Sequence, residues 1–147
     1  MNYTPGPMTP RAYLLILLIL FTIPALAAKV ECPICGMNFE EGARTSYAGK
    51  RGDKPVQFCS FSCAHKFHGH NPKAALEARD FDGGKAVDAG SAWFLIKSKN
   101  VLRELPFDMP PTVVAFSSEA AAKKTRERLK DGEVVKGFET VEKAYAK

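Results

Sequence analysis

Two close pairs of cysteines constrain the fold of this 147-residue chain more than any other feature. Two residues separate Cys32 from Cys35, three separate Cys59 from Cys63, and 23 residues lie between the pairs. Pairs at such spacings form short knuckles, and two knuckles can fold onto one metal ion. Gly36 follows the first pair, and glycine suits the tight turn that a knuckle requires. The spacing therefore predicts a metal site with all four thiols as ligands.

The donor atoms narrow the choice of metal. Met37, directly after Gly36, places a thioether beside the thiols. Sulfur ligands select thiophilic ions such as Cu(I) and Zn(II), whereas Mg(II), Ca(II) and Mn(II) prefer oxygen. The residues alone therefore indicate Cu(I) or Zn(II) and leave the choice between them open.

The cysteines have two alternative uses. An even number of cysteines in a short secreted chain is often a set of disulfides, but bridges within these close pairs would close tiny loops and stabilise little. A thiol–disulfide exchange site at Cys32 and Cys35 would normally stand at the start of a helix, and here an acidic turn over residues 40–42 follows. The sequence also has no glycine-rich phosphate loop, nucleophile elbow or metallohydrolase motif, so we do not expect an enzyme.

The first 28 residues have the pattern of a signal peptide. An apolar run after Arg11 leads to Pro24-Ala25-Leu26-Ala27, which has the small-x-small form of a secretory cleavage site. The run of about a dozen apolar residues is short for a membrane span of roughly twenty. We therefore expect export to the periplasm after cleavage. The alternative is an inner-membrane anchor through residues 11–27, and only an uncleaved segment would make the membrane a partner.

The charge of the exported part argues against nucleic acid as a partner. Cleavage after Ala27 removes Arg11 and no acid, which leaves 20 basic and 16 acidic residues and a formal net charge of +4. Nucleic-acid-binding domains usually show a strongly basic stripe, and this excess is small and dispersed.

The predicted elements form a repeat and indicate an α+β fold. Strands are expected at 44–48 and 55–58 with a turn at 49–53, then a helix capped by Ser60 and ending at Phe67, then a strand at 73–81. The second half repeats this order with strands at 92–96 and 112–116, a helix from Ser117 or Ser118 to Lys130, and a strand at 134–138. We therefore predict tandem ββαβ units, a metal-binding unit at 29–88 and a second unit at 89–147.

The cysteines of the second pair fall around the first turn of the first predicted helix. Free backbone N–H groups and the positive end of the helix dipole favour thiolate over thiol there. We therefore expect Cys59 and Cys63 to ionise readily. His65 and His68 lie three residues apart on the same helix and are expected on a solvated face.

The cysteine motifs resemble two families. Residues 32–72, with Cys32-Pro33-Ile34-Cys35-Gly36-Met37 and Phe58-Cys59-Ser60-Phe61-Ser62-Cys63, resemble the treble-clef-like TRASH and YHS heavy-metal modules. A wider resemblance, from Cys32 to about Val141, is to the NosL family of periplasmic accessory proteins that deliver Cu(I) to nitrous oxide reductase. Its carriers are Cys35-Gly36-Met37, Ala92-Trp93-Phe94-Leu95, Met109 before a Pro-rich turn, Val114-Ala115-Phe116, the helix from Glu119 to Leu129, and Gly132 to Phe138.

The NosL resemblance implies two ββαβ halves and a Cu(I) site formed by Cys35, Met37 and Met109. It also implies a periplasmic copper-enzyme client or a metal donor protein as partner. The chain departs from the family pattern in having the Cys59/Cys63 pair and in lacking a cysteine directly after the apolar segment. The alternative function is a structural or sensing module with fixed Zn(II) in a four-cysteine site, used for protein contact.

Overall fold

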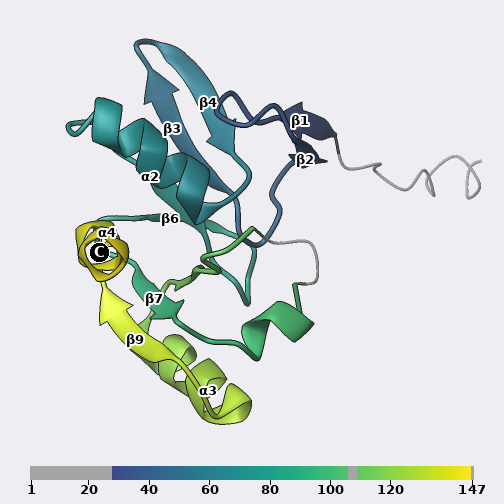
Figure 1. Cartoon of the computed structure of the whole chain (residues 1–147), viewed down its shortest axis with the longest axis vertical. Helices are drawn as coiled ribbons and strands as arrows, with labels where there is room; N and C mark the ends of the chain where they lie inside the picture. The colour runs from purple at the N-terminus through teal and green to yellow at the C-terminus, as the bar shows by residue number, and fades with distance from the viewer. Residues whose placement is uncertain (1–27, 106–108, 147) are drawn as a thin grey trace, which may run out of the picture.

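Antiparallel strand pairing organises the chain (Figure 1). The computed structural model describes residues 28–105 and 109–146. Its helices and antiparallel sheets make an α+β fold, which confirms the predicted fold class. Within these residues, no helix is long and apolar enough to cross a membrane. The expected signal peptide and the alternative anchor lie outside the described residues, apart from Ala28.

From residue 28 on, the first half contains two sheets and one helix. β1 (Lys29–Glu31) pairs with β2 (Asn38–Glu40) in a two-stranded sheet. β3 (Tyr47–Arg51), β4 (Lys54–Phe58), β5 (Glu77–Arg79) and β6 (Ala86–Asp88) form a four-stranded sheet in the order β4-β3-β5-β6. Helix α2 (Phe61–His70) lies between β4 and β5 in the chain.

The described part of the second half has one sheet and two α-helices. β7 (Trp93–Ile96), β8 (Val114–Phe116) and β9 (Glu133–Lys136) pair in the order β8-β7-β9. A short 3-10 helix, η1 (Val101–Arg103), follows β7, α3 (Glu119–Leu129) connects β8 to β9, and α4 (Phe138–Tyr145) follows β9. Each half thus contains strand, strand, helix, strand, and in each the first of these strands lies between the other two.

Several predicted boundaries differ from the structure. The turn expected at 49–53 shortens to Gly52 and Asp53, since β3 and β4 pair up to Arg51 opposite Lys54. A two-residue hairpin turn needs positive φ, which Gly52 supplies at +62°. The last predicted strand ends at Lys136 because Gly137 adopts a φ of +84° and Phe138 begins α4, a helix that the sequence analysis missed.

The two predicted helix caps behave differently. Ser118 precedes α3, and its side chain accepts a hydrogen bond from the N–H of Ala121, which is the usual N-cap contact. Ser60 occupies the same position before α2 but makes no side-chain cap bond, and it is only 1% exposed. Helix α2 also runs to His70, one turn beyond the predicted end at Phe67.

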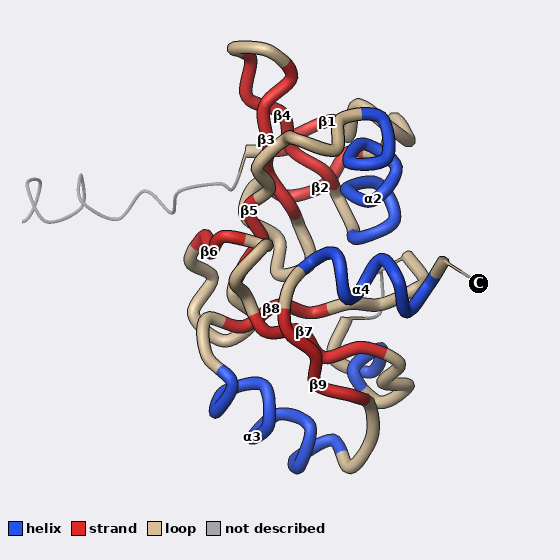
Figure 2. The backbone as a smooth tube through the Cα atoms, turned by 90° about the vertical axis from the view of Figure 1, so that its left-hand side faces the viewer, coloured by secondary structure: helices blue, strands red, loops and turns tan. Residues whose placement is uncertain are grey.

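A shared aromatic core joins the two halves. Phe138 of α4 lies 5.4 Å from Phe61 of α2, 5.7 Å from Tyr47 of β3 and 6.5 Å from Phe94 of β7, measured between ring centroids. The buried cluster around these rings also contains Cys32, Cys59 and Cys63. In Figure 2, α4 lies between the end of the molecule that carries α2 and the end that carries α3. The cysteine region therefore packs against the second half of the chain.

Candidate metal centre

The first cysteine pair lies on a tight turn between β1 and β2. Cys32 follows β1 directly, and its backbone N–H donates to the carbonyl of Met37 over 2.9 Å. The N–H of Gly36 donates to the carbonyl of Cys32 over 2.8 Å, and Gly36 has a φ of +73°. These two bonds close the knuckle and turn Cys35 toward Cys32. Glycine is needed at position 36 because a side chain would be strained at this φ.

The second pair lies where β4 leads into α2. Cys59 follows the last residue of β4, and Cys63 is the third residue of α2. The hydroxyl of Thr45 donates to the carbonyl of Cys59 over 3.4 Å and fixes this junction to the segment before β3. A strand that runs into a helix thus places two sulfurs opposite the knuckle.

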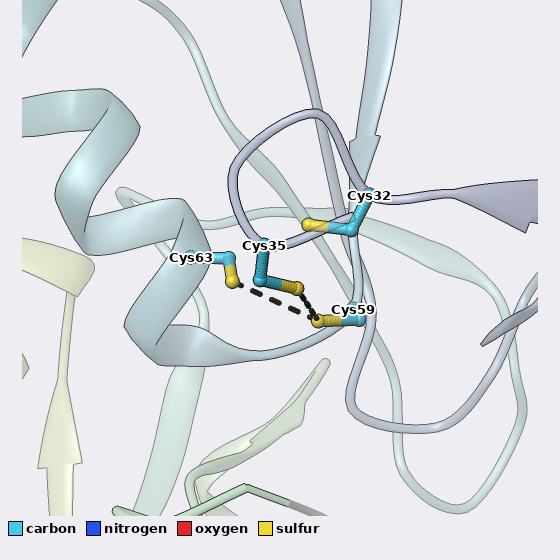
Figure 3. Close-up of side chains that lie close together, drawn as sticks. All are labelled: Cys32, Cys35, Cys59 and Cys63. Carbon is cyan, nitrogen blue, oxygen red and sulfur yellow. Dashed lines mark hydrogen bonds between the residues drawn. The ribbon is translucent and has the colours of Figure 1, made fainter. Parts of the chain in front are cut away.

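The four thiols meet, as the spacing predicted (Figure 3). Their Sγ atoms all lie within 4.8 Å of one another, with 3.5 Å between Cys35 and Cys59 and 3.7 Å between Cys59 and Cys63. A tetrahedral ion with metal–sulfur bonds of about 2.3 Å places its sulfurs about 3.8 Å apart. The observed spacing brackets that value, and among the described residues this is the group of cysteine, histidine and acidic side chains that can hold a metal ion.

One of the four cysteines is open to solvent. Cys32 is 0%, Cys63 3% and Cys59 8% exposed, whereas Cys35 is exposed. An ion in the cluster would therefore be enclosed on three sides by protein and reachable through Cys35. Such an arrangement allows an incoming ligand to approach the metal without unfolding the site.

The buried Cys32 thiol is the easiest of the shifted thiols to ionise. Burial opposes its ionisation, but backbone N–H groups donate to its sulfur and lower its pKa to about 7. The donors belong to Cys59, Ile34 and Cys35. Hydrogen bonds of this kind stabilise a thiolate in the interior and hold it ready for a metal.

The expectation that the start of α2 makes Cys59 and Cys63 acidic is wrong. Burial, reinforced by the neighbouring Cys35 sulfur, raises the pKa of Cys59 to about 11. Burial and the sulfurs of Cys35 and Cys32 raise the pKa of Cys63 well above that of a free thiol. Desolvation and thiolate repulsion thus outweigh the helix dipole at this position. A bound cation would reverse both effects, so these thiols ionise when the metal arrives.

The two methionines named by the family resemblance line one cavity. Met37 is 41% exposed, Met109 is partly buried against the core, and both border a cavity of about 560 Å³ between the two halves. Cys59 borders the same cavity, whereas Cys35 does not. The Ser62 hydroxyl donates to the carbonyl of Pro110 over 3.2 Å, which ties the Met109 segment to the first turn of α2.

His65 and His68 of α2 do not lie on a free face. The Nδ1 atoms of His65 and His68 are 2.8 Å and 3.0 Å from the same carboxylate oxygen of Glu142 in α4. The contact links the helix that carries Cys63 to the C-terminal helix. The sequence analysis missed Glu142, because nothing in the local pattern relates it to residues more than 70 positions earlier.

Comparison with known proteins supports the wider of the two resemblances. The model of the NosL family matches residues 23–146, which is most of the chain. No curated protein and no solved structure matches the chain significantly. The matched range includes the four cysteines and both methionines. Since the match extends over both halves and through the candidate metal ligands, this protein belongs to the NosL family.

Proposed function

We propose that this protein is a metal carrier that holds Cu(I) in its four-cysteine cluster and passes the ion to a copper enzyme of the periplasm, such as nitrous oxide reductase. The observation that carries the proposal is the cluster itself, four sulfurs within 4.8 Å of one another with no other donor type among them. Thiolates of this kind favour soft ions, and the family match favours copper over zinc.

The exposure pattern suits an exchangeable site. Cys35 is exposed while the other three cysteines are buried, so a partner's sulfur ligand can reach the ion from one side. Exchange can then proceed by steps in which one ligand joins before another leaves. A fully enclosed site would release its ion only when the protein opens.

The proposed location follows from the first 28 residues, whose apolar run and cleavage pattern indicate export. The proposed partners are a periplasmic enzyme that needs copper and a protein that donates it. Genomic neighbours of the coding sequence that encode a copper enzyme would support the first, and mass spectrometry of the exported protein would show whether residues 1–27 are removed.

The deciding experiment is an anaerobic titration of the reduced protein with Cu(I) against a competing chelator, run beside Zn(II). A double variant, Cys59→Ser/Cys63→Ser, serves as the comparison. We expect Cu(I) to bind more tightly than Zn(II) and to pass to the chelator without denaturant. A protein that prefers Zn(II) and releases no metal while folded would refute the carrier function.

One observation favours a second function. Cys32, Cys59 and Cys63 belong to the buried core, and backbone N–H groups donate to the Cys32 sulfur. Both features are typical of structural zinc sites. In that case Zn(II) would stay bound until the fold is lost, and the surface around Cys35 would serve protein contact. Thiol–disulfide exchange is a third and weaker hypothesis for the function, because Cys35 is followed by a turn and β2 and not by a helix.

A further inference from the structure

The excess positive charge of this protein is concentrated on the surface around η1 and α3. Residues 97–104 and 119–133 carry eight basic and five acidic side chains, a net charge of +3. The whole segment from Ala28 to Lys147 has a net charge of only +4. The fold therefore gathers on one surface an excess that looks dispersed along the sequence. We call residues 97–104 and 119–133 the basic end.

Ion pairs neutralise only part of the basic end. Three acidic residues there pair with neighbouring bases, as Lys97–Glu133, Lys123–Glu119 and Arg128–Glu104. Within residues 28–105 and 109–146, the other bases of this surface have no ion-pair partner; they are Lys99, Arg103, Lys124, Arg126 and Lys130. All five are exposed. Charges without a partner on the protein remain available to an anion from outside.

Hydrogen bonds hold η1 against the end of α3. The side-chain amide of Asn100 donates to the carbonyl of Leu129 over 2.8 Å. The carboxylate of Asp131 accepts from the backbone N–H groups of Lys99 and Asn100. The bases of the two helices therefore belong to one surface. The negative end of the α3 dipole accounts for bases in its last turn, but not for Lys124 in the middle of the helix.

An exposed leucine lies beside these bases. Leu102 of η1 is 39% exposed and stands between the buried Val101 and the exposed Arg103. Among the described residues, the other large apolar side chain with such exposure is Met37 in the cysteine knuckle. Bases beside an apolar side chain suit a lipid surface, where the bases meet phosphates and the apolar side chain enters the headgroup layer.

The basic end lies far from the metal centre. Helix α3 is at one end of the molecule, whereas β1, β2 and α2, between which the cysteines meet, are at the other (Figure 1, Figure 2). A protein that takes the metal must reach the exposed Cys35, so its docking site is expected near the cysteines. A surface that binds the basic end would leave Cys35 free.

We propose that the basic end binds the surface of an anionic phospholipid membrane and turns the metal centre away from it. The lipid phosphates pair with Arg103, Lys124, Arg126 and Lys130, and Leu102 enters the headgroup layer. This contact differs from an anchor through residues 11–27, because it uses charge and needs no apolar span. Each base near such a surface adds about fivefold in affinity, so a net charge of +3 gives about a hundredfold preference for anionic over neutral lipid. Salt weakens this preference.

Acetylation of lysine side chains, read by mass spectrometry, tests which surface meets the lipid. The full-length protein is mixed with vesicles of phosphatidylglycerol and phosphatidylcholine or, separately, of phosphatidylcholine alone. We expect the anionic vesicles to slow the acetylation of Lys124 and Lys130 and to leave Lys50 and Lys54 of the β3–β4 hairpin unchanged. The apolar run before residue 28 would attach to both kinds of vesicle, so the comparison isolates the charge of the lipid. Equal rates at Lys124 and Lys130 with the two vesicles would overturn the proposal.

Two triple variants separate the basic end from net charge. Each removes three exposed bases without ion-pair partners; they are Lys124→Gln/Arg126→Gln/Lys130→Gln at the basic end and Lys50→Gln/Arg51→Gln/Lys54→Gln in the hairpin. The first should lower the preference for anionic over neutral vesicles about a hundredfold. The second should lower it less than about threefold, because the hairpin lies beyond the reach of a screened surface charge. Equal losses would mean that net charge alone decides binding, and the proposal would be wrong.

An acidic protein is the other partner that this charge would fit. A poly-glutamate peptide is the probe for it, in the same acetylation experiment. If the peptide protects Lys124 and Lys130 and the anionic vesicles do not, the basic end takes an acidic protein and the membrane contact is refuted. The titration with Cu(I) and Zn(II) does not depend on this result, so the carrier function stands or fails separately.

Discussion

Protons released when the metal binds will test how the fold sets the pKa values of the thiols. A thiol must lose its proton before its sulfur binds the ion. At pH 8, Cys32 with a pKa of about 7 carries about 0.1 proton, whereas Cys59 with a pKa of about 11 carries about one. At pH 6, Cys32 carries about 0.9 proton. Cys32→Ser should therefore reduce proton release by about 0.1 at pH 8 and by about 0.9 at pH 6.

The assay adds Zn(II) in excess to weakly buffered, reduced protein and reads the released protons with an indicator dye. Cys59→Ser is the matched comparison, and it should reduce the release by about one proton at both pH values. Cys63→Ser should behave like Cys59→Ser, because burial also raises the pKa of Cys63. If Cys32→Ser and Cys59→Ser each remove a full proton at pH 8, the backbone N–H groups do not stabilise a thiolate at Cys32 and the reasoning is wrong.

Three further predictions concern stability, each measured as the free energy of unfolding in urea. Glu142→Gln removes the charge that His68 and its neighbouring histidine contact, and should cost about 1 kcal/mol, because the pair is partly exposed; an unchanged value would mean that the link between α2 and α4 adds nothing. Gly132→Ala should cost about 3 kcal/mol, since its φ is +90° and a Cβ would lie 2.8 Å from a leucine carbon and 2.9 Å from a carbonyl oxygen. The control Gly52→Ala, with a φ of +62° and open space around it, should cost only about 1 kcal/mol. In the metal-free protein, burial raises the pKa of Cys59 from 9.0 to about 11, so folding favours the neutral thiol. The contribution of this thiol to the free energy of unfolding is complete below pH 9 and is lost as the pH rises through 11. Cys59→Ala should be less sensitive to pH over that window, and equal sensitivity would contradict the assignment.

Local patterns in the sequence predicted the features that depend on neighbours in the chain. The spacing of the cysteines predicted their meeting, because each pair needs only a short turn to place two sulfurs together. Ser118 caps α3 through a contact three residues away. Gly36 adopts the positive φ that a knuckle turn requires. In each case, residues within a few positions of one another in the sequence determine the local structure.

Features that depend on the other half of the chain could not be predicted in this way. The pKa values of Cys59 and Cys63 follow from burial against packing partners that the local pattern does not reveal. Glu142 and Phe138 lie in α4, which was not predicted because the strand expected at 134–138 includes the first residue of this helix. The cavity that both Met109 and Cys59 border exists only once the halves have packed. Tertiary contacts, and not propensity, decide these properties.

The presence of three of the four clustered cysteines within the shared core links metal supply to the lifetime of the protein. An ion that binds only the folded chain stabilises it by mass action, so the empty protein opens more often than the loaded one. Proteases act on the opened chain in proportion to its population. We therefore expect proteases to clear the metal-free protein first, so that the abundance of this protein follows the metal available to it without any change in its synthesis.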